Sequence, residues 1–158
     1  MLNWGMIQRV YIDTSVVGGI LDTEFDVFTK MFFDKAFRRE IRLIVSDLLE
    51  EELINAPNGI KTFFRTIPAE QLEFVRLTKD AIELAEAYIS EKVVGETSRA
   101  DCRHIAIATI SKADVLVSWN FKHIVNLKRI RGYNSINLRE GLHTLEIRSP
   151  KELMEYEN

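Results

Sequence analysis

The sequence predicts an α/β fold with a mainly parallel central sheet. Short β-branched runs alternate with longer helical patterns, no internal repeat is present, and no shift in composition suggests a second domain. With 158 residues, of which 46% are hydrophobic and 28% charged, the chain has the composition of one globular domain. We therefore expect residues 1–158 to form a single domain, with strands joined by right-handed helical crossovers.

Strands and helices alternate in the first half of the chain. Its β-branched runs end at Asp, Thr and Ser residues that suit helix N-caps, and aromatic residues from Phe25 to Phe32 recur at helical spacing. Pro57-Asn58-Gly59 is strong punctuation that ends a helix. The predicted elements are a strand at 10–12, a helix at 24–39, a strand at 42–45, and helices at 47–55 and 60–66.

Capping residues mark the elements of the second half. Thr78 and Ser98 can each cap a helix, and Ser149-Pro150 followed by Glu152 has the pattern of a capping box. The predicted elements are a helix after Thr78, a helix at 99–112, a strand at 115–117, a basic helical segment at 121–131, a last strand at 144–147 and a helix after Ser149.

Charge and cysteine content exclude several classes of protein. The 21 basic and 24 acidic residues give a net charge of −3, which excludes a broadly basic nucleic-acid coat but not a local basic patch. Cys102 is the only cysteine, so neither an internal disulfide nor a thiolate zinc cluster can form. The lack of disulfides fits a cytoplasmic protein. Neither a signal peptide at 1–10 nor a membrane-spanning apolar run is expected.

Acidic residues fall where parallel sheets usually place their sites, outside the carboxyl ends of the strands. Asp13 directly follows the first strand, and Asn120 follows the strand at 115–117. Asp101 lies at the start of the helix that runs into that strand. Glu52 lies on the inward face of the helix at 47–55. Asp114 precedes its strand and therefore belongs to the opposite edge.

This group of oxygen donors predicts a metal site. Several carboxylates held close together would repel and raise one another's pKa, and a divalent cation relieves that repulsion. Oxygen ligands without thiolates favour Mg²⁺ or Mn²⁺ over zinc. Such a metal suits phosphodiester hydrolysis, because it activates a bound water and stabilises charge on the phosphate.

Each candidate also has a purely structural interpretation. Asp13 suits a helix N-cap, and Asp101 is favoured in a first helical turn by the helix dipole. Glu52 could simply pair with an arginine, and Glu51 is an equally acidic neighbour. Trp119 could stack on a nucleobase, but a tryptophan directly after a buried strand is more often part of the core.

Four segments resemble, in order, the motifs of the PIN domain found in VapC-type toxins. They are 10–15, 46–53 with Glu52-Leu53 as its best-aligned pair, 101–108 and 114–124. The resemblance implies a PIN-like three-layer α/β/α sandwich with a mainly parallel sheet, usually a homodimer. It also implies a Mg²⁺- or Mn²⁺-dependent endoribonuclease that is often paired with an antitoxin protein occluding its site.

The resemblance also assigns roles to individual residues. Asp13, Glu52 and Asp101 would be the metal carboxylates, while Asn120 falls where many members have Asp and could ligate through its amide oxygen. The residues that would support Asp13 by hydrogen bonding are Ser118, Thr14 and Ser15.

Cations near this acidic group are needed for RNA to approach. Arg99 and Arg103 flank Asp101, and Lys122 lies two residues beyond Asn120, so these three are candidate RNA contacts. The basic residues at 128–131 are as well explained by a solvated helix face. His104 and His123 suit packing or hydrogen bonding, with RNA contact as the alternative, and neither is expected to bind zinc.

Three functional hypotheses follow. The leading one is a metal-dependent ribonuclease toxin that acts on RNA. The second keeps the fold without the chemistry, as an RNA- or protein-binding module whose catalysis is weakened by Asn120. The third is a phosphoryl-transfer enzyme with Asp13 as nucleophile, which is disfavoured because Ser15 stands where a second Asp would act as general acid.

Overall fold

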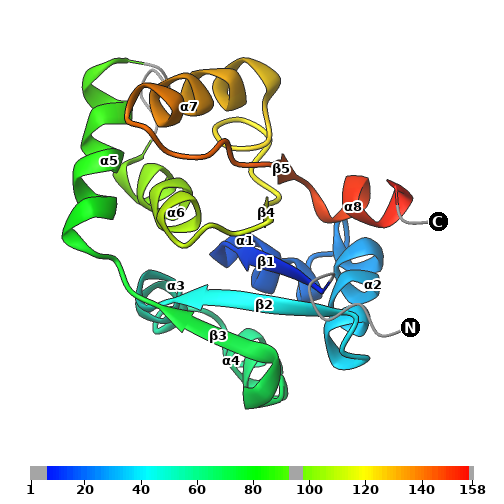
Figure 1. The fold of residues 1–158 in the computed structure, drawn as a ribbon. Coiled ribbons are helices and arrows are strands. Elements are labelled where there is room, and N and C mark those ends of the chain that lie inside the picture. Colours follow the sequence, from blue (N-terminus) through cyan, green and yellow to red (C-terminus); the bar gives the residue numbers. More distant parts are fainter. Residues whose placement is uncertain (1–6, 93–97, 157–158) are drawn as a thin grey trace.

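Five strands form one parallel sheet in the order β3-β2-β1-β4-β5 (Figure 1). The structure is a computed structural model that describes residues 7–92 and 98–156. The strands are β1 (Gln8–Ile12), β2 (Ile41–Ser46), β3 (Leu72–Val75), β4 (Val115–Val117) and β5 (Ile147–Arg148). The predicted α/β class with a parallel sheet is confirmed.

Helices cover both faces of the sheet. The α-helices are α1 (Thr14–Gly18), α2 (Asp26–Phe37), α3 (Asp47–Leu53), α4 (Asn58–Arg65), α5 (Lys79–Ser90), α6 (Arg99–Ile110), α7 (Leu127–Arg139) and α8 (Pro150–Tyr156). One buried cluster joins the sheet to α1–α4 and α8, and a second joins it to α5–α7. The arrangement is the predicted three-layer sandwich (Figure 1).

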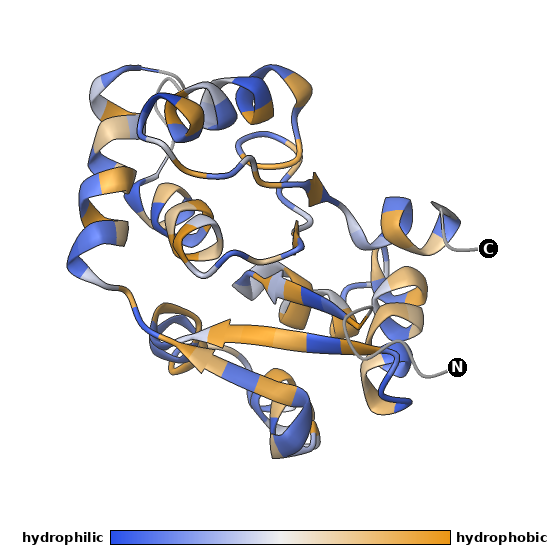
Figure 2. Ribbon diagram, viewed as in Figure 1, coloured by the Kyte–Doolittle hydropathy of each residue, from blue (hydrophilic) through white to orange (hydrophobic). Residues whose placement is uncertain are grey.

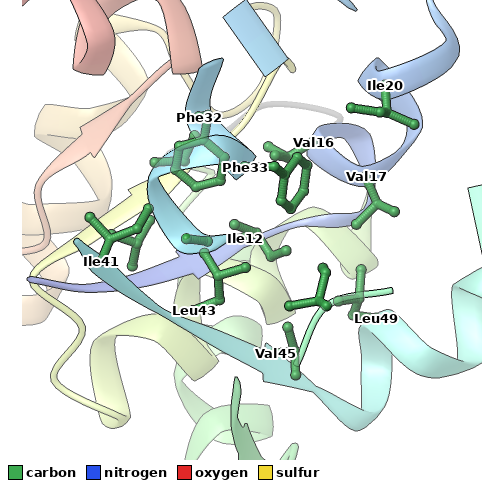
Figure 3. Close-up of a cluster of buried hydrophobic side chains, with 14 of the residues drawn as sticks. Ile12, Val16, Val17, Ile20, Phe32, Phe33, Ile41, Leu43, Val45 and Leu49 are labelled. Carbon is green, nitrogen blue, oxygen red and sulfur yellow. The ribbon is translucent and has the colours of Figure 1, made fainter. Parts of the chain in front are cut away.

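Alternation along β1 decides which side chains meet which helices. Val10 and Ile12 pack with Phe32 and Phe33 in the first cluster, which Figure 3 shows around Ile12. Tyr11 points to the other face and joins the cluster of α5–α7. Figure 2 shows the strands as mostly hydrophobic ribbon, as expected for a parallel sheet buried on both faces. No helix in the described part of the chain is both long and apolar enough to span a bilayer.

Side-chain caps fix the helices next to the sheet. Asp13, Ser46, Thr78 and Ser98 each accept a backbone N–H as the N-cap of the helix that follows. The capping box before α8 is confirmed: the Ser149 amide donates to Glu152 at 3.0 Å, and the Glu152 amide donates to the Ser149 hydroxyl at 3.1 Å. These caps explain why most predicted helices begin within a residue or two of the observed positions.

The predicted helical segment at 121–131 begins too early. The segment after Asn120 is a turn, because the Asn120 side-chain oxygen accepts from the His123 amide at 2.9 Å. The helix begins only after Asn126, whose side chain caps it by accepting from the Arg129 amide. It then continues to Arg139 as α7.

Two strands also differ from prediction. The last strand was expected at 144–147, but β5 pairs only Ile147 and Arg148 with β4. The Asn134 side chain holds Leu145 instead, accepting from its amide at 2.7 Å and donating to its carbonyl at 3.0 Å. The edge strand β3 was not predicted at all. It has four residues, none of them fully buried, so its hydrophobic pattern is weak.

Candidate active site

The carboxyl edge of the sheet gathers the polar residues predicted for the site. Asp13 and Ser118 directly follow the neighbouring strands β1 and β4, and Ser46 ends β2 on the other side of β1. Asp101 lies in the first turn of α6 and Glu52 near the end of α3. Asp114, in contrast, accepts from the amide of Arg9 near the start of β1, which places it at the opposite edge as expected.

Asp13 is a buried carboxylate held by hydroxyl groups. Its Oδ1 accepts from the Ser15 hydroxyl at 2.6 Å and the Val16 amide at 3.3 Å, and its Oδ2 accepts from the Ser118 hydroxyl at 2.6 Å. Only 4% of the residue is exposed. Burial raises the pKa of Asp13 above its ordinary value, although the nearby His104 and these hydrogen bonds oppose the rise.

Glu52 is half-buried and receives two hydrogen bonds on one oxygen. The Thr14 hydroxyl lies 2.7 Å from Oε1, and the Nε2 atom of His104 lies 2.6 Å from the same oxygen. Burial alone would raise the pKa of Glu52, but the hydrogen bonds from His104 and Thr14 and the charge of His104 bring it below its usual value. Glu52 is therefore a carboxylate at neutral pH.

Ser118 and Asn120 connect Asp13 to Asp101. The Asn120 amide N–H donates to the Ser118 hydroxyl at 2.9 Å, and the Asn120 side-chain amide donates to Asp101 Oδ2 at 3.2 Å. Since Ser118 in turn donates to Asp13, one hydrogen-bonded path joins these four residues. The structure thus places four predicted residues in one network, three candidate ligands and the supporting Ser118. Glu52 is tied to Thr14, the residue after Asp13.

The predicted supporting residues divide into two groups. Ser15 and Ser118 both donate to Asp13, as expected. Thr14 does not: its hydroxyl donates to Glu52, because the helical turn that begins at Asp13 carries it toward α3. His104 was expected to pack or hydrogen-bond, and it does both, with only 2% of the residue exposed. Its specific partnership with Glu52 was not predicted, because the two residues lie 52 positions apart in the sequence.

The three predicted RNA contacts differ in exposure and in the ion pairs that they already form. Arg99 forms a two-pronged ion pair with Glu86, with N–O distances of 2.7 and 2.9 Å. Arg103 is half-buried, whereas Lys122 is exposed. Of these three predicted contacts, Lys122 is the one that is exposed and has no hydrogen bond or ion pair to the described residues.

Trp119 belongs to the core rather than to an open surface. Its indole N–H donates to the Thr29 hydroxyl at 2.9 Å, and its ring stacks on Phe25 with centroids 4.3 Å apart. Its neighbour Phe121 is 48% exposed and lies edge-on to Trp119. Phe121, not Trp119, is therefore the aromatic side chain exposed at this position.

A ready-made metal cluster is not present among residues 7–92 and 98–156: no three His, Cys, Asp or Glu side chains there converge closely enough to hold an ion. The donor chemistry nevertheless fits a hard divalent cation. A carboxylate offers about four lone-pair sites, and Glu52 and Asp101 each keep one oxygen without a hydrogen bond to the described residues.

The sheet order, its parallel strands and the helices on both faces define a PIN-like fold. No family model and no curated protein matches the sequence. Among solved structures, VapBC2 from Rickettsia felis bound to a promoter DNA fragment has a TM-score of 0.57 at 11% identity, covering 89% of this chain and 98% of that one. DNA-bound VapBC from Salmonella typhimurium has a TM-score of 0.54 at 15% identity, covering 91% and 99%.

A third similar structure is VapC20 from Mycobacterium tuberculosis, a toxin that cleaves the sarcin–ricin loop. It has a TM-score of 0.55 at 13% identity, and the match covers 70% of this chain and 89% of that one. These likenesses establish that the chain has the fold of VapC toxins, and they confirm at the level of fold the resemblance noted in the sequence.

Proposed function

We propose that this protein is a Mg²⁺- or Mn²⁺-dependent endoribonuclease and the toxin of a toxin–antitoxin pair. The observation that carries the proposal is the convergence of Asp13, Asp101 and Asn120 on one network, with Glu52 tied to its edge. A fold shared with VapC20, which cleaves RNA, adds support. An antitoxin partner, a homodimer and a cytoplasmic location are parts of the same proposal.

Glu52 and Asp101 are the residues we assign to hold the metal. Mg²⁺ usually keeps several waters and takes only one or two protein carboxylates, so it does not need a closed cluster of three. Each of the two side chains has an oxygen that the described residues leave without a hydrogen bond. Asp13 accepts three hydrogen bonds, which leaves about one of the roughly four acceptor sites of a carboxylate.

When bound, the metal would lower the pKa of a water and neutralise charge on the scissile phosphate. The chain's own residues hold the surrounding charges in place. Ser15 and Ser118 keep Asp13 fixed, and Asn120 orients Asp101 by donating to one of its oxygens. This gives Asn120 a positioning role, and direct metal ligation by its oxygen stays a prediction. Lys122, exposed beside the site, would receive the RNA backbone.

The test compares RNA cleavage by three proteins. Wild-type protein should cleave a single-stranded RNA when Mn²⁺ is added, and Asp101→Asn should reduce the rate by at least about a hundredfold while the melting temperature stays close to that of the wild type. Glu51→Gln is the matched control, because Glu51 is exposed and lies next to Glu52 without joining the network. Full activity in Asp101→Asn would refute the assigned site.

A binding module without nuclease activity is the second candidate. The observation that favours it is the neutral Asn120, whose side-chain amide donates to one oxygen of Asp101 and so competes with a metal for that oxygen. Calorimetric titration separates the two: saturable Mn²⁺ binding supports the nuclease, and its absence supports the module. Phospho-transfer through Asp13 has no such support, since both carboxylate oxygens are bonded and the residue is buried.

A further inference from the structure

A chain of buried polar side chains lies behind Glu52. The Tyr11 hydroxyl is 2.9 Å from the Ser46 hydroxyl and 2.6 Å from Nδ1 of His104. The Nε2 atom of His104 is 2.6 Å from Glu52 Oε1. Tyr11 and Ser46 are fully buried, and His104 is nearly so. The chain therefore runs through the interior from the end of β2, across β1 and α6, to the acid on α3.

The proton positions along this chain follow from what each group can donate. The Glu52 carboxylate only accepts, so Nε2 of His104 must carry a proton. In a neutral imidazole, Nδ1 is then unprotonated and accepts a hydrogen bond from the Tyr11 hydroxyl. Burial raises the pKa of the Tyr11 phenol well above its ordinary value, so this donor keeps its proton. The Ser46 hydroxyl accepts from the Leu49 amide and can donate to Tyr11, which satisfies every member of the chain.

We propose that His104, with its tautomer fixed by Tyr11, is a positioning residue that orients Glu52 for the metal. The inference rests on the proposed function. His104 and Thr14 both donate to Oε1, so Oε2 is the oxygen left for a ligand. An acid held in this way does not have to be ordered when the metal binds. His104 itself acts only through Glu52, because both of its ring nitrogens are engaged and it is buried.

The two other glutamates of α3 lack the support that Glu52 has. Glu50 and Glu51 lie on the same helix but are exposed, and neither has a hydrogen bond to the described side chains. Glu52 differs from them by facing α6, where His104 lies. Of these three glutamates of α3, Glu52 alone is held by hydrogen bonds to described side chains, and it lies near the carboxyl edge of the sheet.

The first measurement reads the tautomer directly. Long-range ¹H–¹⁵N spectra of the wild-type protein should show His104 protonated at Nε2, the nitrogen that faces the Glu52 carboxylate. His104→Gln assigns its signals among the three histidines. Protonation at Nδ1 instead would overturn the inference, whether or not the protein is a nuclease.

The second measurement is Mn²⁺ affinity at fixed pH, with the melting temperature recorded for each variant. His104→Leu keeps an apolar side chain in the buried space but cannot donate, and we expect it to weaken Mn²⁺ binding about ten- to a hundredfold. His104→Gln should restore most of the affinity, because its amide can both donate to Glu52 and accept from Tyr11. Tyr11→Phe, which removes one hydroxyl, should weaken binding by a smaller factor and serves if His104→Leu does not fold.

A histidine outside the site serves as the control for Mn²⁺ affinity. His143 is exposed, so His143→Leu should bind Mn²⁺ like the wild type. Wild-type Mn²⁺ affinity in both His104→Leu and Tyr11→Phe overturns the positioning role alone. Absence of Mn²⁺ binding by the wild-type protein overturns the proposed function and this inference with it.

Discussion

Replacing Ser118 by alanine should destabilise the protein by about 1.5 to 4 kcal/mol. Ser118 is fully buried and donates to Asp13 Oδ2 at 2.6 Å, and a hydrogen bond to a charged group contributes about 1.5 to 3 kcal/mol. The hydroxyl also accepts from the Asn120 amide at 2.9 Å, and loss of that acceptor adds up to about 1 kcal/mol. For a chain of this size the melting temperature should fall by roughly 5 to 15 °C.

The pH dependence of this loss tests its cause. Burial already raises the pKa of Asp13 in the folded protein, so the folded state holds the proton more tightly than the unfolded chain does. Stability linked to Asp13 is thus greatest below its ordinary pKa and is lost as the pH rises through the folded pKa. Removing Ser118 takes away a hydrogen bond that lowers this pKa, which widens the difference between the two states. The destabilisation should therefore be greater at about pH 7 than at about pH 4, because lowering the pH favours protonated Asp13, which the Ser118 hydroxyl stabilises less than the carboxylate.

Urea unfolding of the wild type and Ser118→Ala at both pH values measures this directly. Ser135→Ala is the control, because Ser135 is exposed on α7 and its loss should change stability by less than about 0.5 kcal/mol. An equal destabilisation at the two pH values would refute the argument, since it would mean that the charge of Asp13 does not strengthen the bond.

Two further substitutions test the packing and the charge of the site. Gly19→Ala should destabilise the protein by about 2 to 4 kcal/mol in urea unfolding, because a Cβ there would lie 2.8 Å from the indole nitrogen of Trp119. Gly18→Ala is the control: a Cβ at Gly18 meets nothing within 4 Å, so this variant should be neutral or slightly stabilising. Asn120→Asp should lower the melting temperature without metal, since it replaces a donor to Asp101 by a like charge. Added Mn²⁺ should raise the melting temperature of this variant more than that of the wild type. An unchanged response to Mn²⁺ would contradict the assignment of Asp101 as a metal ligand.

Much of the fold was predictable because its signals are local. β-Branched runs that end in capping residues located β1, β2 and β4, and the rule that parallel strands share a carboxyl edge brought Asp13 and Asn120 together. The start of α7 was misplaced because the turn before it is made by side chains. Asn120 and Asn126 each accept a backbone N–H there, a pattern that a basic helical composition conceals.

The contact between His104 and Glu52 could not be predicted, because it depends on tertiary packing. Tyr11 is hydrophobic in pattern and simply alternates with its neighbours along β1. Only when α6 packs on that face of the sheet does its hydroxyl meet His104. The sequence spacing between Glu52 and His104 carries no sign of this contact, which spans 52 residues of chain.

The three acids at the carboxyl edge accept hydrogen bonds from different sets of donors. Hydroxyl groups hold Asp13, an imidazole and a hydroxyl hold Glu52, and a side-chain amide holds Asp101. None of these partners is a lysine or arginine whose fixed charge would compete with a cation for the same carboxylates. A divalent ion would therefore not have to displace a permanent positive charge. The ionisable group among these partners is the His104 imidazole, which can also make both of its hydrogen bonds when neutral.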